Sequence, residues 1–151
     1  MNVQQLEQLE TELQFEQFTN DDALKLGLLI TDYAKETDKA IAIHIERNRV
    51  PIFSHLMEGT SEENVFWSYR KKRVVDHYNH SSHYIAKRFE EAGTTHDVSS
   101  LLSPSEYQAV GGSFPIRVKG AGVIGSVTVS GLTPQLDHDY VVEGIKRFLK
   151  R

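Results

Sequence analysis

Hydrophobic residues recur at helical spacing in four stretches of the chain. In residues 2–14, leucines and a valine return every three or four positions among Glu and Gln, and residues 23–36 follow a segment of N-capping residues. The third stretch runs from about residue 61 to residue 91, and Gly93 shortly after it is a helix-ending residue. The fourth stretch covers residues 135–149. The spacing predicts four helices, of which the third is one long, uninterrupted helix.

Strict alternation of apolar and polar residues predicts two β-hairpins. Residues 41–56 alternate on both sides of an Arg-Asn-Arg turn, and residues 114–130 do so around a Lys-Gly-Ala turn. Pro51 cannot donate to a strand ladder, so we expect it at a strand start or on a sheet edge. Residues 13–18 also alternate and predict a further short strand.

The order of these elements decides the fold class. Hairpins separated by helices favour an antiparallel sheet over a parallel one, because parallel strands need a crossover connection between them. We therefore expect an α+β fold, with an antiparallel β-sheet flanked by α-helices in an α/β/α sandwich. The 151 residues contain no internal repeat and no linker, so residues 1–151 are predicted to form a single domain.

Composition narrows the chemistry. The chain has no cysteine, which excludes disulfides, thiolate nucleophiles and zinc–thiolate sites.

It begins without a basic segment followed by an apolar run, and no apolar run approaches the roughly 20 residues that span a bilayer. We expect a cytoplasmic protein that binds no membrane. The net charge of −4 argues against nucleic acid, and the basic run Arg70–Arg73 is interpreted as a solvated stretch of helix.

The long predicted helix carries the richest set of chemical groups. On a helical projection, one arc of apolar residues forms the core face, and the opposite arc faces solvent. The solvent arc contains Lys72, Asp76, Asn79, His83, Lys87 and Glu90. The flank between the two arcs contains Arg73, His77, His80, Ser81, Tyr84 and Arg88.

Two interpretations of this flank remain open. Arginine and histidine side chains are what a pocket for an anionic ligand uses, since they donate hydrogen bonds to carboxylate or phosphate. Alternatively, the side chains border the core and extend their polar ends to water or to another subunit. A metal site is disfavoured, because His77 and His80 have no acidic third ligand fixed in the sequence.

The second candidate is the loop Gly111-Gly112-Ser113-Phe114. Two glycines permit a positive φ and a close approach by a ligand, and their consecutive N–H groups are able to form an anion-binding nest. The alternative is a plain loop that leads into a strand. No phosphate-binding Gly-Lys-Ser/Thr follows it, and no catalytic triad is legible, so enzymatic activity is left undecided.

The glycine pattern carries a resemblance. The runs Gly111–Ile116 and Gly122–Gly131, with an acid at Asp137 or Asp139 before the last helix, resemble the haem-degrading-domain family, which includes GlcG-like and HbpS-like proteins and the C-terminal domain of PduO. The resemblance implies a profilin-like sandwich and homo-oligomers. It also implies haem as a cofactor, which no other feature of the sequence indicates. The bulky, basic stretch Trp67–Val75 departs from the small-residue pattern of many members and marks an uncharacterised branch.

Three functional hypotheses follow. The first is a small-molecule module that binds an anionic ligand between the Gly111–Ser113 loop and the Arg73/His77 flank. The second is an enzyme or a haem-binding or haem-degrading protein that uses His77 or His80. The third is an oligomeric scaffold, or protein-interaction module, without a small ligand.

Overall fold

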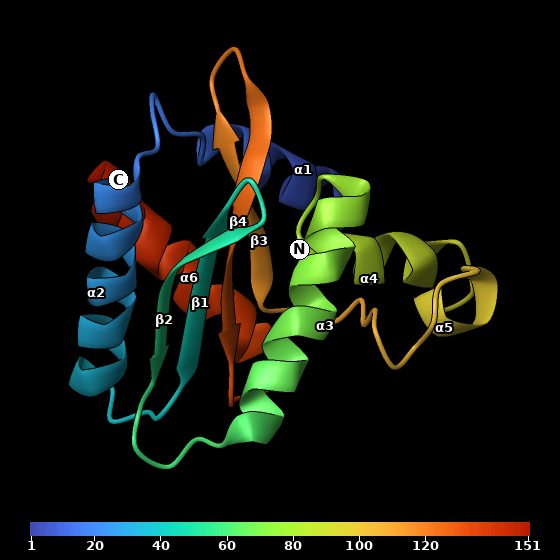
Figure 1. The fold of residues 1–151 in the computed structure, drawn as a ribbon. Coiled ribbons are helices and arrows are strands. Elements are labelled where there is room, and N and C mark those ends of the chain that lie inside the picture. Colours follow the sequence, from blue (N-terminus) through green and yellow to red (C-terminus); the bar gives the residue numbers. More distant parts are fainter.

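The computed structural model describes residues 1–151 and forms three layers (Figure 1). A four-stranded antiparallel sheet, in the order β2-β1-β4-β3, lies between two helices on one face and one on the other. The strands are β1 (Ala42–Arg47), β2 (Val50–Leu56), β3 (Ser113–Val118) and β4 (Gly122–Ser130). The helices are α1 (Val3–Glu12), α2 (Asn20–Glu36), α3 (Glu62–Tyr78), α4 (Ser82–Glu91), α5 (His96–Ser99) and α6 (Pro134–Leu149). The predicted α+β sandwich is confirmed.

Local signals set several element boundaries. Thr19 caps α2 by accepting a hydrogen bond from the Asp22 N–H, and Thr133 does the same for α6, where Pro134 occupies the first turn. Asn48, in the first hairpin, has a positive φ of 52°, as the tight two-residue hairpin turn requires. Pro51 lies on the edge strand β2, as predicted.

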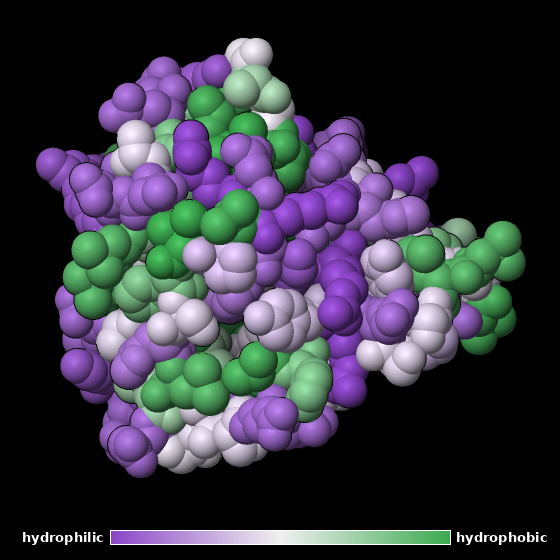
Figure 2. Space-filling view, viewed as in Figure 1, coloured by the Kyte–Doolittle hydropathy of each residue, from purple (hydrophilic) through white to green (hydrophobic).

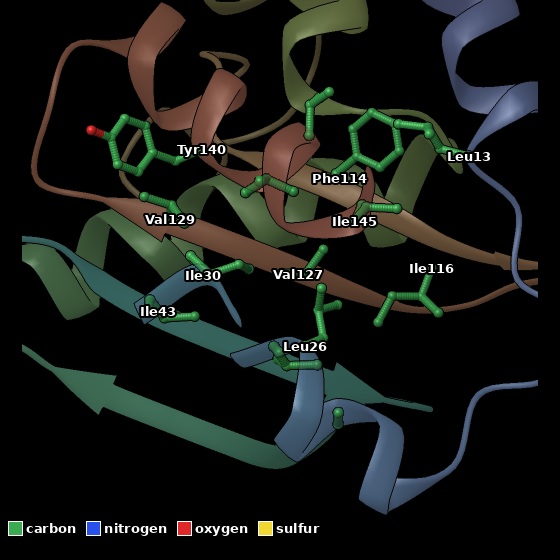
Figure 3. Packing of buried hydrophobic residues seen from close by; sticks show 14 of the residues in the cluster. Leu13, Leu26, Ile30, Ile43, Phe114, Ile116, Val127, Val129, Tyr140 and Ile145 are labelled. Carbon is green, nitrogen blue, oxygen red and sulfur yellow. The ribbon is translucent and has the colours of Figure 1, made fainter. Parts of the chain in front are cut away.

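The main hydrophobic core fills the space between the sheet and helices α2 and α6. Alternate residues of the inner strands point into it, and these are fully buried (Figure 3). Figure 3 shows Ile43, Phe114, Ile116, Val127 and Val129 from the sheet facing Leu26, Ile30, Tyr140 and Ile145 from the helices. The two helices pack closely because Gly144 leaves room for Ile30, whose Cγ1 would lie 2.3 Å from an added Cβ.

The opposite sheet face, beneath α3, is polar. Strand alternation turns His44, Glu46, Ser113, Ser126, Thr128 and Ser130 towards this side. Helix α3 places Lys71 and Lys72 against it, and these residues are only 2% and 9% exposed. The interpretation of Arg70–Arg73 as a solvated stretch is therefore wrong for its two lysines. The helical projection missed this because it assigned apolar residues alone to the buried face.

The predicted long helix is two helices. Asn79 adopts the left-handed conformation with a φ of 60° and ends α3, and Ser81 caps α4 by accepting from the Tyr84 N–H. Asparagine tolerates this conformation and serine favours the N-cap, so both residues encode the break. The turn also buries His83, which the projection had assigned to solvent.

The remaining segments connect these layers. The predicted strand at 13–18 is reduced to a single parallel bridge between Phe15 and Val118. Helix α1 packs against α4 at the top of the molecule, and α5 lies in the lobe that projects at the right of Figure 1. None of the helices combines the length and apolar character that crossing a bilayer requires.

Candidate functional site

The structure distributes the predicted site residues over three places. The loop Gly111–Ser113 lies against Lys71 of α3 and Asp137 of α6. Arg73 and His77 lie against the segment 104–107, and His80 and Tyr84 face α1. The structure therefore does not bring the loop and the Arg73/His77 flank together. Lys71 faces the loop instead.

Arg73 and His77 pack α3 against the connector that precedes β3. The Arg73 Nη1 donates to the Glu106 carbonyl over 3.1 Å, and its guanidinium lies 5.8 Å from the centre of the Tyr69 ring. The exposed His77 ring meets the Tyr107 ring edge-on, with 6.0 Å between ring centres. These contacts fix the connector to the helix.

Ser113 and Phe114 are both buried. The Ser113 N–H donates to the Ser82 Oγ over 3.0 Å, and the Ser113 Oγ lies 2.8 Å from the Thr128 Oγ1. The Phe114 side chain points into the main core and is 1% exposed. The two residues thus hold the glycine loop in place from below.

A cleft of about 370 Å³ opens beside this loop. We call it the glycine-loop cleft; its lining consists of Glu63, Asn64, Trp67, Lys71, Val110, Gly111, Ser130, Gly131, Leu132, Pro134 and Asp137. It lies between the first half of α3, the loop and the start of α6. No sequence pattern marks Asn64, Trp67 and Lys71 as lining residues, because they are far from the loop along the chain.

The floor of the glycine-loop cleft is a buried ion pair. Lys71 Nζ donates to Asp137 Oδ2 over 2.9 Å, to the Val129 carbonyl over 2.6 Å and to the Gly111 carbonyl over 3.3 Å. Burial lowers the pKa of Lys71 and raises the pKa of Asp137, because desolvation disfavours both charged forms, and the partners' mutual attraction offsets part of this.

The glycine loop carries backbone N–H groups without an acceptor in the chain. Those of Gly111 and Gly112 donate to no carbonyl or side chain, and the same holds for Gly131 across the cleft. Gly111 is buried and Gly131 is exposed, and both line the cleft, so their N–H groups are available to a ligand or to water. At Gly112, φ is +135° and a Cβ would lie 2.3 Å from Lys71 Nζ, so a larger residue is excluded.

Two neutral histidines lie behind the loop. The rings of His83 and His138 are 4.5 Å apart, and Gly111 adjoins His83. Burial lowers the pKa of His138 to about 3, with a smaller contribution from His83, and burial also lowers the pKa of His83. No group of three or more His, Cys, Asp or Glu side chains gathers in a metal-ligating arrangement.

The sequence is similar to those of a known protein family. Residues 18–146 match the family described as "Haem degrading protein HbpS-like". A UPF0303 protein of Streptomyces coelicolor is 45% identical over 97% of this chain and 93% of its own length. A UPF0303 protein of Burkholderia pseudomallei is 41% identical over 96% of this chain and 88% of its own length.

Solved structures share the fold. The crystal structure of the Ybr137w protein aligns with a TM-score of 0.91 and 27% identity, covering 99% of this chain and 88% of the other. The crystal structure of a PduOC:heme complex aligns with a TM-score of 0.72 and 15% identity, covering 85% and 92%. That of HbpS aligns with a TM-score of 0.67 and 20% identity, covering 87% and 89%.

Proposed function

This chain belongs to the HbpS-like haem-degrading family, and from that premise we propose that it binds a small anionic ligand in the glycine-loop cleft without turning it over. The observation that carries the proposal is the pair of unpartnered N–H groups at Gly111 and Gly131, two residues that line the cleft together with Lys71. Backbone N–H groups beside a positive charge favour carboxylate or phosphate oxygens.

The cleft also has the dimensions and walls for an organic anion. A volume of about 370 Å³ lies in the range of small-molecule sites. Trp67, Val110 and Leu132 supply an apolar wall, so a carboxylate on a short carbon skeleton fits better than a bare inorganic ion. The contact from Lys71 to the Gly111 carbonyl, at 3.3 Å, is the longest of its three and the easiest to exchange for a ligand oxygen.

The polar groups of the cleft support binding rather than turnover. The hydroxyl of Ser130, which lines the cleft, donates to the Asn64 carbonyl over 2.6 Å and lies 3.0 Å from the Ser68 Oγ. A serine nucleophile needs a hydrogen-bonded base, and neither neighbour is one. The two oxygens of Asp137 accept hydrogen bonds from Lys71 and from the Leu132 N–H, and no hydroxyl group that could act as a nucleophile bonds to this carboxylate.

A ligand screen tests this proposal. Acetate, succinate, citrate and inorganic phosphate are to be titrated by calorimetry and by thermal shift, where a ligand at 100 times its dissociation constant stabilises by about 2.7 kcal/mol. Binding of at least one organic anion is the expected result. Absence of binding by all four probes at about 10 mM would refute the proposal.

A matched pair of variants locates the binding site. Glu63 lines the cleft mouth and is exposed, whereas its neighbour Glu62 does not line it. Removing the negative charge in Glu63→Gln should tighten anion binding by about two- to fivefold at low salt, and Glu62→Gln should change it less. Equal effects of the two substitutions would place the anion elsewhere.

Haem is a second candidate ligand, favoured by family membership and by the haem complex of a fold neighbour. Haem carries two carboxylates, and the exposed His77 is the imidazole that we expect to reach the iron. Titration of haem, followed by its Soret absorption, decides this. Loss of the band in His77→Ala would support haem ligation, and an unchanged spectrum would exclude His77 as the ligand.

A scaffold role is favoured by the free edge of β2. Leu56 on β2 and Phe66 on α3 are 40% and 49% exposed, and Leu24 and Leu28 on α2 are each 50% exposed. Figure 2 shows apolar patches on the face of the molecule that it displays. Unpaired edge strands readily accept another strand. We propose that copies of the chain associate here, and light scattering measures the assembly. A monomer at all concentrations would exclude the scaffold role.

A further inference from the structure

A second cleft, of about 360 Å³, lies between α1 and the β3–β4 hairpin. We call it the α1 cleft; its polar wall consists of Glu7, Glu10, Thr11, Gln14, His80 and Arg117. Figure 1 shows the hairpin projecting beside α1 at the top of the molecule. The α1 cleft shares no lining residue with the glycine-loop cleft, so the two are separate sites.

The carboxylate of Glu10 is buried in this wall and has few hydrogen-bond donors. The residue is 2% exposed, yet its contacts are all long: 3.3 Å to the Ser81 N–H, 3.3 Å to His80 Nδ1 and 3.6 Å to Arg117 Nη2. Good charge-assisted hydrogen bonds measure about 2.7–2.9 Å, and a carboxylate accepts up to about four. Glu10 therefore has capacity for a further donor in the cleft.

The guanidinium of Arg117 has hydrogen-bond donors that lack an acceptor. Its Nη2 donates to the Asn79 carbonyl over 2.8 Å, while its Nε and Nη1 protons have no acceptor in the chain. The side chain is 26% exposed. Arg117 and Glu10 form only a long ion pair, at 3.6 Å, and each is also held at a different point of the break between α3 and α4, Arg117 at Asn79 and Glu10 at Ser81.

We propose that the α1 cleft binds a small zwitterion of the α-amino acid class. The ammonium group, with three donors, binds Glu10 and the nearby Glu7, and the carboxylate binds the free N–H groups of Arg117. His80, held in a stack with Tyr84 at 4.1 Å between ring centres, closes the side of the site. A simple anion would face Glu7 and Glu10, and a simple cation would face Arg117, so both are disfavoured.

The walls of the α1 cleft are fixed before any ligand arrives. Helix α1 begins with a capping box between Asn2 and Gln5, and its apolar side is buried at Leu6 and Leu9, which are 1% and 8% exposed. Preformed walls reduce the entropy that binding costs. Gly120 and Gly122 on the hairpin side leave open space, since a Cβ at either would meet no atom within 4 Å.

Amino acids and their one-charge analogues test the proposal directly. Each of the common amino acids is to be screened by thermal shift at about 5 mM, followed by calorimetry on those that stabilise the chain. The amine and the acid that share the best ligand's skeleton should bind at least about tenfold more weakly, because each lacks one charged contact. Absence of binding by every amino acid, or equal binding of either analogue, would overturn the proposal.

Variants on α1 assign the binding to this cleft. Glu7→Gln, an exposed position, should weaken the amino acid by about threefold or more, whereas Glu12→Gln, on the same helix outside the cleft, should change affinity less than about twofold. Arg117→Gln should abolish binding and Arg117→Lys should restore part of it, with circular dichroism confirming the fold. Weakening by Glu63→Gln, with Glu7→Gln silent, would move the ligand to the glycine-loop cleft and refute this site.

Discussion

Lys71 and Lys72 are the residues on which the polar layer beneath α3 depends. Lys72 Nζ lies 2.7 Å from carboxylate oxygens of both Glu46 and Asp76, and His44 also bonds Glu46. Burial alone would raise the pKa of Glu46, but hydrogen bonds from His44 and Lys72 outweigh it and hold the pKa below its usual value. Each ammonium therefore compensates a carboxylate that has little access to water.

Substitutions along the basic run should separate these roles. Lys72→Met leaves the buried Glu46 without its ammonium partner and should lower the free energy of unfolding by about 3 kcal/mol. Lys71→Met removes the ammonium partner of the buried Asp137 and should have a similar cost. Arg70→Met and Arg73→Met, at partly exposed positions, should cost less than about 1 kcal/mol. Urea denaturation measures all four. Equal costs at the four positions would contradict the burial of the two lysines.

His138 should make the stability of the chain dependent on acid. The unfolded chain takes up a proton here below a pKa of 6.5, whereas the folded chain does so only near 3. Stability therefore falls as the pH drops through this window, by about 1.4 kcal/mol per pH unit for this proton. His138→Gln should reduce the slope of unfolding free energy against pH. The exposed His55→Gln is the control, and an equal slope in wild type and His138→Gln would contradict the buried neutral state.

At the scale of elements, the break between α3 and α4 shapes much of the surface. Asn79 and Ser81 end one helix and begin the next, and their backbone groups anchor Arg117 and Glu10 in the α1 cleft. The break also buries His83 against α6. In a continuous helix, the backbone groups of Asn79 and Ser81 would bond within the helix and would not be available to Arg117 and Glu10.

The conformation of Asn79 is open to a direct test. Asn79→Ala should destabilise by about 1 kcal/mol, because alanine is strained at a φ of 60°, while Asn79→Gly should be neutral within a few tenths of a kcal/mol. Urea denaturation of the two variants measures the difference. If alanine proved as stable as glycine, the left-handed turn would not be a determinant of the break.

At the scale of the whole molecule, the sheet separates two unlike interiors. One side packs aliphatic and aromatic groups against α2 and α6, and the other joins charged and hydroxyl groups to α3. Substitutions on opposite sides share no partner, so their effects should add.

A double-mutant cycle tests that separation. Ile30→Val, which should cost about 1 kcal/mol, and Lys72→Met should combine additively to within about 0.5 kcal/mol. Lys71→Met and Asp137→Asn, which share one ion pair, should depart from additivity by more than that. Coupling between Ile30 and Lys72 as strong as that between Lys71 and Asp137 would show a single interior instead of two.

The architecture was largely predictable from local pattern. The alternation in 41–56 and 114–130 and the apolar spacing of the helices gave the order of elements and the sandwich, and the glycines of 111–131 gave the family. The sites were less predictable. The sequence indicated the glycine loop and His80 as candidates, but not Trp67, Lys71, Glu10 or Arg117 as their neighbours, because those side chains meet only across the fold.

The amino-acid sequence alone determined the order of the main helices and the two hairpins, since periodicity, capping residues and turn glycines act over a few positions. Tertiary structure decided which polar groups are buried and which face each other. Lys71 shows why: its ammonium is stable in the interior only because Asp137 and two carbonyls, 40 to 66 positions away, converge on it. Periodicity carries no information about such distant partners. For this reason Lys71, in a basic run that was predicted to be solvated, lies in the floor of a cleft.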